Sequence, residues 1–256
     1  FPALFFLVVF MLILNTGRFA PRKIKEAIMA ALSLIVASIF CWYCLAHLPL
    51  KDYRPFAVGK NIRQQMEIPE GKEAPKYAVD YGLVNKKTGE EKTINSDEYV
   101  KSGIWKDDSW EISSTSEPYL VKEGYVPPIQ DFGIFNLDGD DMSEEVLSAP
   151  VCFLVVSKDV NEAAERGLAD LNRLAQKAEE KGYLFIGLTP SSYDEVEDFR
   201  HRHQLMWTFA MADETMLKTM IRSNTGLILL NKGTIVGKWH YNDFPTFGDL
   251  KKQFSL

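Results

Sequence analysis

Two cysteines stand three residues apart in an apolar stretch of the chain, at Cys41 and Cys44. Side chains three positions apart on a helix are neighbours, so these two thiols could approach each other. His47 follows three residues beyond Cys44 on a similar face. A redox-active group within a membrane helix is a functional candidate, and the chemistry indicated is thiol oxidation. The alternative is that both thiols only pack, because a mid-helix disulfide at this spacing is strained.

The third cysteine offers no comparable chemistry. Cys152 lies within the apolar run from Val151 to Val156, where a buried thiol behaves as a small inert hydrophobe. Three cysteines are also too few for a disulfide scaffold.

Other polar clusters do not have the spacing of a metal site. His201 and His203 are two residues apart, so on a helix they point to different sides and cannot chelate one ion. The acidic cluster that begins at Asp138 departs from the calcium-loop pattern at its sixth and twelfth positions. Asp138-Gly139 is instead typical of a hairpin turn. We therefore predict no metal site.

The cysteine pair lies in a segment suited to a membrane. No charged residue occurs from Ala27 to Leu50, and a helix over 27–48 is long enough to cross a hydrocarbon core of ~30 Å. A second apolar run, Phe1 to Leu14, precedes it. Because the chain begins inside that run, we expect 1–14 to be part of a further spanning helix. Residues 1–50 are thus predicted to be a transmembrane region of α-helices.

Charged residues predict the orientation of this region. The loop between the two apolar runs is basic, with Arg18, Arg22, Lys23 and Lys25. Short basic loops stay cytoplasmic, and Trp42 and Tyr43 lie toward the other end of the second helix, where aromatic rings favour the interface. The chain beyond residue 50 is therefore predicted to lie outside the cytoplasm. In a bacterium this corresponds to the periplasmic side of the inner membrane.

Composition restricts the partners of the remaining chain. Hydrophobic residues make up 46% of the sequence and charged residues 25%, which is ordinary for a folded globular part. The net charge of −6 argues against a nucleic-acid partner, because binding phosphates requires a concentrated basic face.

The segment 51–124 is predicted to be a β-rich connector. Lys76 to Leu83 and Lys92 to Val100 flank a turn-forming cluster that ends at Gly89, which indicates a β-hairpin. Two further short strands are expected around Glu111 and Leu120. No catalytic spacing occurs in this segment.

The chain from residue 125 onward predicts a soluble α/β domain. The unbroken apolar run 151–156 is typical of a central strand that is buried on both faces. An amphipathic helix is expected over 161–181, followed by a second buried strand over 183–188. Ser192 and Glu195 have the spacing of a capping box. The predicted order continues with strand 206–211, helix 214–222, the hairpin 227–240 and a last helix 247–254.

Particular motifs in this region resemble those of thioredoxin-like proteins of the TlpA and peroxiredoxin type. Pro127 to Phe132 followed by Asn136-Leu137-Asp138-Gly139 resembles their first strand and hairpin. Ser143 to Leu147 is similar to the stretch before their central strand, and Leu229 to Val236 resembles their last hairpin. The resemblance covers 126–256 and implies a thioredoxin-like fold.

The residues that carry thiol chemistry in that family are missing. Thioredoxins place Cys-x-x-Cys where the helix after the central strand begins, because the helix N-terminus lowers the thiol pKa. Residues 157–163 of this chain contain no cysteine, and Asn224 stands at the position of the family's cis-proline. We therefore expect the domain to be redox-inactive and to need no cofactor. The groove that the fold retains would be lined by Ser157, Asp159, Asn224 and Thr225.

The N-terminal region has a resemblance of its own. Two spanning helices ahead of Leu48 to Phe56 are similar to the end of DoxX/MauE-type membrane proteins of Bacteroidota. Some of these proteins carry a thioredoxin-like tail outside the cytoplasm, joined by a β-rich segment. The chain would then hold the last two of the usual four helices.

Three functions are compatible with these observations. In the first, the redox-inactive domain is a binding or accessory module of a DoxX-like membrane protein, with the bilayer and a membrane or periplasmic protein as partners. In the second, Cys41 and Cys44 form a membrane oxidoreductase that exchanges electrons with a quinone or a partner thiol. In the third, the chain is an anchor or assembly factor without chemistry, so enzymatic activity is left open.

Overall fold

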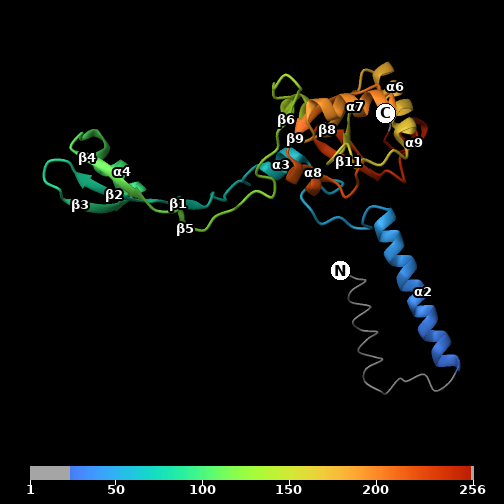
Figure 1. Ribbon diagram of the computed structural model, residues 1–256, viewed down its shortest axis with the longest axis horizontal. Helices are drawn as coiled ribbons and strands as arrows, with labels where there is room; N and C mark the ends of the chain where they lie inside the picture. The colour runs from blue at the N-terminus through green and yellow to red at the C-terminus, as the bar shows by residue number, and fades with distance from the viewer. Residues whose placement is uncertain (1–23, 255–256) are drawn as a thin grey trace. The chain divides into compact units, whose positions relative to one another are not determined.

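The computed structural model describes residues 24–254 (Figure 1). The predicted partial helix 1–14 lies outside these residues. The chain divides into two compact units. One unit combines Phe1–Gln64 with Asp131–Leu256, and the other is Gln65–Gln130.

A six-stranded mixed sheet is the centre of the first unit, with strand order β11-β10-β7-β8-β9-β6. β7, β8 and β9 are parallel, whereas β10 is antiparallel to both β7 and β11, and β6 is antiparallel to β9. The strands are β6 (Ile134–Phe135), β7 (Cys152–Val156), β8 (Leu184–Thr189), β9 (Thr208–Ala212), β10 (Gly226–Asn231) and β11 (Thr234–His240). This is the arrangement that the thioredoxin-like resemblance predicts.

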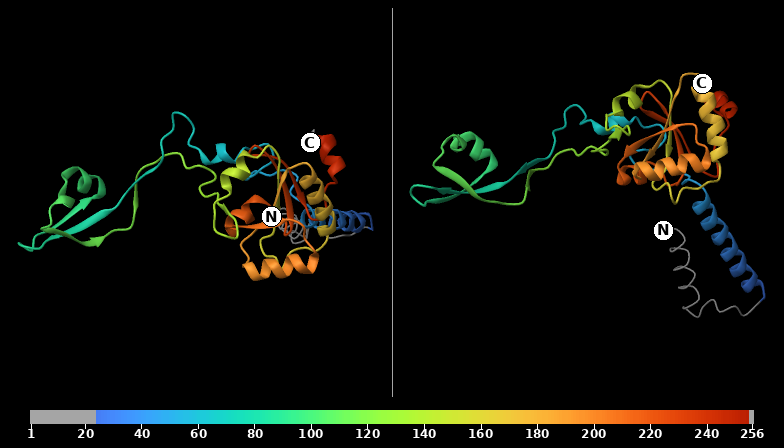
Figure 2. Two further views of the ribbon diagram at one scale, coloured as in Figure 1. Left: turned by 90° about the horizontal axis from the view of Figure 1, so that it is seen from above. Right: turned by 45° about the horizontal axis from the view of Figure 1, so that its top comes forward.

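Helices lie on both faces of this sheet (Figure 2). On one face, Phe153 and Val155 of the fully buried β7 pack in one cluster with residues of α6, α7 and α9. Their neighbours Cys152 and Leu154 point to the other face, where α8 packs against β8. The helices are α5 (Ser143–Ser148), α6 (Leu168–Glu180), α7 (Tyr193–His203), α8 (Glu214–Met220) and α9 (Phe247–Phe254).

Several sequence predictions for this sheet are confirmed. The central strand is buried along its whole length, and the capping box of Ser192 and Glu195 opens α7. The hairpin between β10 and β11 turns at Lys232 and Gly233, both at positive φ.

The predicted start of the first long helix is wrong. The helix was expected over 161–181, but α6 begins at Leu168. Gly167 precedes it with a φ of 86°, a left-handed conformation that an α-helix cannot contain. Residues 158–167 form a loop whose backbone N–H groups donate to other segments, among them Asn224 and Ser191.

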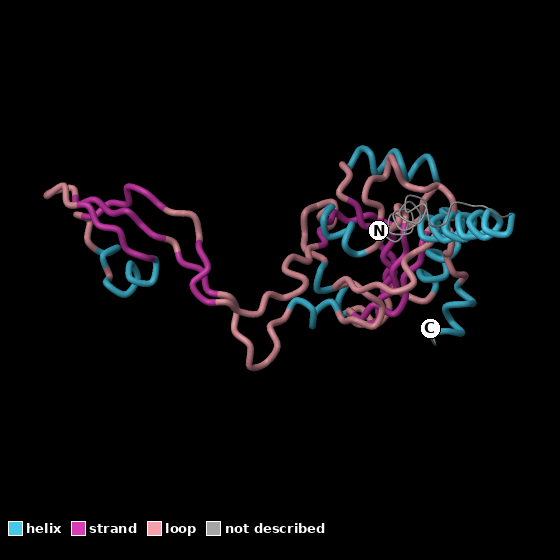
Figure 3. Tube along the Cα trace, turned by 90° about the horizontal axis from the view of Figure 1, so that it is seen from below, coloured by secondary structure: helices cyan, strands magenta, loops and turns pink. Residues whose placement is uncertain are grey.

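The unit Gln65–Gln130 is a small antiparallel structure, with its strands drawn in magenta in Figure 3. One sheet has the order β3-β2-β4, and β1 pairs separately with β5. The elements are β1 (Lys76–Ala78), β2 (Asp80–Asn85), β3 (Glu91–Asn95), α4 (Ser96–Ser102), the 3-10 turn η1 (Ile104–Lys106), β4 (Trp110–Thr115) and β5 (Tyr119–Lys122).

The hairpin predicted in this unit is present, but its second strand is shorter than expected. β3 ends at Asn95, and the residues to Ser102 are helical. The Asn95 side chain accepts a hydrogen bond from the backbone N–H of Glu98, at 2.9 Å, and so caps α4. This local cap outweighs the strand-like composition around Val100.

The apolar segment, for which a spanning helix over 27–48 is predicted, forms the helix α2 (Ile24–Ala46). Its insertion in a membrane stays a prediction. Among the residues that the structure describes, no helix has both the length and the mean hydropathy of a membrane span. Large hydrophobic side chains are nevertheless exposed along α2: Leu32, Leu34, Ile35, Val36, Ile39, Phe40, Trp42, Tyr43 and Leu45.

Residues 51–64 differ from the rest of the predicted connector, because they belong to the unit with the large sheet. The backbone N–H of Gly59 donates to the Ile235 carbonyl at 2.7 Å, and that of Ile62 donates to the Gly233 carbonyl at 2.8 Å. This segment, which continues into α3 (Ile62–Met66), thus lies along the outer edge of β11. The main-chain groups of an edge strand favour such pairing, which the sequence pattern did not indicate.

Candidate functional site

The structure brings Ser157 and Thr225 together at one end of the large sheet. Ser157 follows β7 and Thr225 precedes β10, and the register pairs Val156 with Gly226. The Ser157 Oγ and Thr225 Oγ1 atoms are 3.4 Å apart, and both residues are buried. Two residues 68 positions apart in sequence therefore share one polar contact.

Asp159 and Asn224 meet beside this pair. The Asn224 Nδ2 donates a hydrogen bond of 2.9 Å to the backbone carbonyl of Asp159. The Asn224 Oδ1 is buried and has no hydrogen-bond partner among the residues that the structure describes. The peptide bond between Asn224 and Thr225 is cis.

The loop 158–167 covers this place and bonds to it. The backbone N–H of Ala164 donates to the Asn224 carbonyl at 2.8 Å. On the other side, the Val160 N–H donates to Ser191 Oγ at 3.2 Å, and Asn161 Nδ2 donates to Glu195 at 2.8 Å. The predicted groove is thus partly occupied by the chain's own backbone.

This arrangement does not supply thiol chemistry, because hydroxyl, carboxamide and backbone groups stand where the resemblance would place a thiolate. Ser157 and Thr225 are buried, so a ligand could reach only the partly exposed Asp159 and Asn224. The sequence indicated Ser157, Asp159, Asn224 and Thr225 but not Ala164 and Ser191. These two contribute through contacts of the loop that no sequence motif indicates.

The prediction that Cys152 is buried is confirmed, and its inertness stays a prediction. Its side chain has no exposed surface, and burial raises the pKa of the thiol far above its ordinary value. Since the thiolate is the nucleophile, burial disfavours reaction of this thiol. Cys41 is partly exposed and Cys44 is exposed on α2, both as free thiols. Their redox activity stays a prediction.

His47 lies against Asp243 of the loop after β11. Its Nδ1 is 2.8 Å from both carboxylate oxygens of Asp243, and the Tyr43 ring is 4.6 Å from the imidazole. The structure therefore gives His47 a partner from the large-sheet domain, which its spacing from Cys44 did not indicate.

The other histidines and the acidic turn have structural partners. The His201 side chain is exposed, whereas the ring of His203 packs on Phe199 at 4.9 Å. At the acidic turn, the Asn136 side chain accepts from the backbone N–H groups of Asp138 and Asp140, which supports the hairpin-turn prediction. Within residues 24–254 no group of three or more His, Cys, Asp or Glu side chains could hold a metal ion.

Comparison with known proteins finds similarity in structure only. No protein-family model and no curated protein sequence matches the chain. A putative protein disulfide isomerase from Bacteroides thetaiotaomicron superposes with a TM-score of 0.41 and 16% identity over 49% of this chain and 84% of its own. The C-terminal domain of a putative thiol-disulfide oxidoreductase from the same organism gives 0.39 and 19% over 48% and 88%.

A thiol-disulfide oxidoreductase from Bacteroides fragilis superposes with a TM-score of 0.39 and 18% identity over 47% of this chain and 95% of its own. Scores and identities in this range do not carry an activity to the chain. The thioredoxin-like fold follows from the strand order and connections of residues 131–254 themselves.

Proposed function

We propose that the chain is a membrane-anchored, redox-inactive thioredoxin-like module that binds a protein partner outside the cytoplasm. In this proposal residues 1–50 are the end of a DoxX-like membrane region in a bacterial inner membrane. The large-sheet domain lies in the periplasm, and its polar site holds the partner without a cofactor.

One observation carries the proposal. The place where a thioredoxin holds its reactive cysteines is here the loop 158–167, which contains no cysteine and bonds to Asn224 through Ala164. Cys152 is buried in the central strand. The fold is retained, and the position of the thioredoxin cysteines holds none, which supports a role other than thiol exchange for this domain.

The anchoring rests on the sequence and on the surface of α2. No charged residue occurs in α2 after Glu26, and its large hydrophobic side chains from Leu32 to Leu45 are exposed. An exposed apolar surface of this extent is typical of a membrane or protein contact.

The first experiment measures thiol–disulfide exchange of the full chain in liposomes, with a fluorescent glutathione disulfide as substrate. We expect the Cys152→Ala variant to exchange at the rate of the unaltered chain. A loss of exchange in Cys152→Ala alone would show that the thioredoxin-like domain is an active oxidoreductase and would reject the proposal.

The second experiment tests partner binding with a benzophenone amino acid at Asp159, in native membranes. The matched control carries the same group at Asp170, an exposed position on α6. We expect a protein adduct from position 159 that persists when all three cysteines are replaced by alanine, and none from position 170. Equal adducts at both positions, or none at either, would contradict the binding role.

The alternative function is a membrane thiol oxidoreductase that uses Cys41 and Cys44 with a quinone or a partner thiol. It is favoured by two free thiols on one helix, of which Cys44 is exposed. Alkylation of native membranes with a mass tag, with and without reductant, tests it. A reductant-sensitive pair supports the oxidoreductase, whereas two thiols that stay free under oxidising conditions reject it and leave the binding module or a plain anchor.

A further inference from the structure

The polar site lies at the edge of the large sheet where β7 and β11 end and β10 begins, together with the loop after β11. The register places Gly226 of β10 opposite both Val156 of β7 and His240 of β11. Residues that follow β7, precede β10 and follow β11 therefore lie at the same edge. These are the residues of the site and the loop 241–244.

Direct contacts connect this loop to the site. The backbone N–H of Tyr241 donates to Ser223 Oγ at 3.2 Å, and Ser223 Oγ in turn donates to the carbonyl of Thr225. A Cβ placed on Gly167 would lie 2.7 Å from the Phe244 ring and 3.2 Å from the Tyr241 carbonyl oxygen. The loops 158–167 and 241–244 are thus packed against each other.

The same loop also holds the end of α2. The last carbonyls of a helix have no partner within it, and here Asn242 Nδ2 donates to the Ala46 carbonyl at 2.7 Å. One residue further, Asp243 accepts from His47 at 2.8 Å. His240 and the Tyr43 ring also interact with His47. The loop therefore caps the helix that is proposed to enter the membrane.

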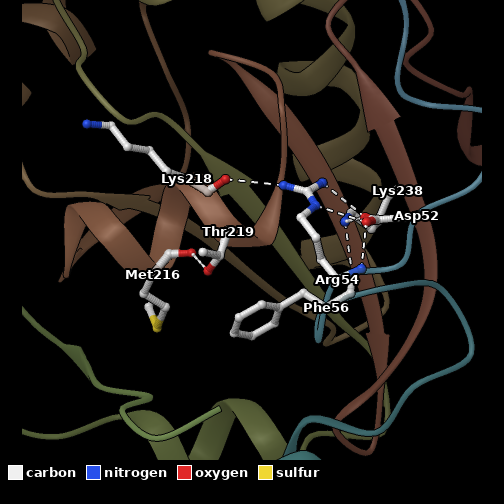
Figure 4. A network of polar contacts seen from close by, with 7 residues as sticks. All are labelled: Asp52, Arg54, Phe56, Met216, Lys218, Thr219 and Lys238. Atoms are coloured by element: carbon white, nitrogen blue, oxygen red, sulfur yellow. Dashed lines mark hydrogen bonds and ion pairs between the residues drawn. The ribbon is translucent and has the colours of Figure 1, made fainter. Parts of the chain in front are cut away.

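A second set of contacts continues along the chain after α2 (Figure 4). Asp52 receives hydrogen bonds from Arg54 at 2.9 Å and from Lys238 of β11 at 2.8 Å. Lys238 also donates to the Phe56 carbonyl, and Arg54 donates to the carbonyl of Lys218 at the end of α8. The Lys238 side chain is only 4% exposed, so its bonds to Asp52 and Phe56 are largely shielded from solvent.

Contacts at both places restrict how the domain can turn on α2. The helix end is held by the loop 241–244, and the following residues are held along β11. The short segment between Ala46 and Asp52 is bonded to the same domain on both of its sides. The edge of the sheet that holds α2 is also the edge that holds the polar site.

We propose that the polar site faces the membrane and that its partner is a membrane-embedded protein, reached at the bilayer surface. This inference rests on the anchoring part of the proposed function. An anionic lipid headgroup is a poorer occupant, because recognition of anionic lipids uses basic clusters. The loop 158–167 instead mixes two basic with three acidic residues: Lys158, Asp159, Glu162, Glu165 and Arg166.

The experiment measures the distance of two edges of the domain from the membrane surface. The full chain with Cys41→Ser and Cys44→Ser is reconstituted in liposomes that contain nickel-chelating lipid. A spin label is attached either at Glu162→Cys, in the loop over the site, or at Ser148→Cys, at the opposite edge near the β10–β11 hairpin. Both positions are exposed, and the buried Cys152 does not react with the label.

We expect relaxation by nickel at position 162 to exceed that at position 148 severalfold. The double variant Asn242→Ala with Asp243→Ala, which removes the cap on α2, should reduce this ratio toward one. A relaxation ratio of one or below in the chain that keeps Asn242 and Asp243 would overturn the inference. Flotation of the same liposomes separates the two proposals: a chain that does not float overturns the anchor and this inference together.

The partner is tested by the benzophenone group at Asp159 with a membrane fractionation. We expect the adduct to contain an integral membrane protein that stays in the membrane after carbonate washing. An adduct made only with a soluble periplasmic protein would overturn the inference while leaving the binding function intact. An adduct with lipid but no protein would overturn both.

Discussion

The two compact units of the chain differ in how their polypeptide is stabilised. In Gln65–Gln130 the buried hydrophobic side chains are Ala78, Leu83, Ile94 and Ile129. In the large-sheet domain a single cluster joins residues from β7, α6, α7, β9, β10 and α9. The smaller unit depends on a few side chains and on local turns and caps, whereas the larger one depends on contacts between distant segments.

This difference indicates which of the two units can hold a functional site. A site built from loops keeps its geometry only where a packed scaffold holds the ends of those loops. The polar site lies at the end of the fully buried strand β7, which meets that condition. The smaller unit has few buried contacts, which is typical of a region that opens locally at low free-energy cost.

The largest effect is expected from the variant Phe153→Ala. Phe153 is fully buried in β7 and packs on Phe185, with ring centroids 5.5 Å apart. Removing the ring leaves a cavity and should lower the free energy of unfolding by about 3–5 kcal/mol. Denaturant unfolding followed by tryptophan fluorescence measures it. Tyr77→Ala, which removes an exposed ring in the smaller unit, is the control and should change little.

The second variant, Leu83→Ala, tests whether the smaller unit opens independently. Leu83 is 1% exposed and lies in the central strand of its sheet. Its truncation should cost about 2–4 kcal/mol, but only within Gln65–Gln130. Hydrogen exchange should accelerate in β2, β3 and β4 and stay unchanged in β7 and β8. Faster exchange in β7 as well would show that the two units unfold together.

The third variant, Asp52→Asn, compares a buried ion pair with an exposed one. Burial alone would raise the pKa of Asp52, but hydrogen bonds from Arg54 and Lys238 outweigh it and hold that pKa well below the ordinary range. The loss in free energy of unfolding at pH 7 should be about 2 kcal/mol.

The sign of the pH dependence follows from the lowered pKa. The contribution of Asp52 to the free energy of unfolding is present above its unfolded-state pKa of about 4. It is lost as the pH falls toward the lower pKa of the folded state. Stability curves of the two proteins should therefore converge below about pH 4. Asp97→Asn, which breaks the exposed pair with Lys76, is the control and should have no measurable effect. A difference that does not depend on pH would contradict the assignment.

The smallest losses of stability are expected when one glycine in each unit is replaced by alanine. Gly167 and Gly103 both have positive φ, but a Cβ on Gly103 would meet no atom within 4 Å, whereas one on Gly167 would meet Phe244. Gly103→Ala should cost about 1 kcal/mol for the left-handed conformation alone. Gly167→Ala adds the steric conflict and should cost about 2 kcal/mol. Equal losses in thermal unfolding would show that the loop 158–167 can move away from Phe244.

Much of the fold could be predicted because its signals are local. The apolar run of β7, the Ser192 capping box and the turn at Gly233 each depend on a few neighbouring residues. The start of α6 was missed because Gly167 and the bonds of the loop 158–167 override a helical pattern. The helix α4 was not predicted, because the residues around Val100 have a strand-like composition even though Asn95 caps the helix.

The candidate site was predicted in part. Ser157 and Thr225 could be placed together from the family resemblance, and their hydroxyl groups are 3.4 Å apart. The bonds of Asp52 to Lys238 and of His47 to Asp243 could not be predicted. Each joins residues more than 180 positions apart, and no sequence motif connects them.

The sequence by itself determined an apolar helix with two thiols, the order of strands and helices after residue 125, and the lack of cysteine in the residues that follow β7. These properties depend on side-chain type and short spacing, which set local conformation before any long-range contact forms. The tertiary structure alone decided that the end of α2, the strand β11 and the polar site meet at one edge. Such meetings depend on strand register and on the closure of long loops, which a linear pattern does not encode.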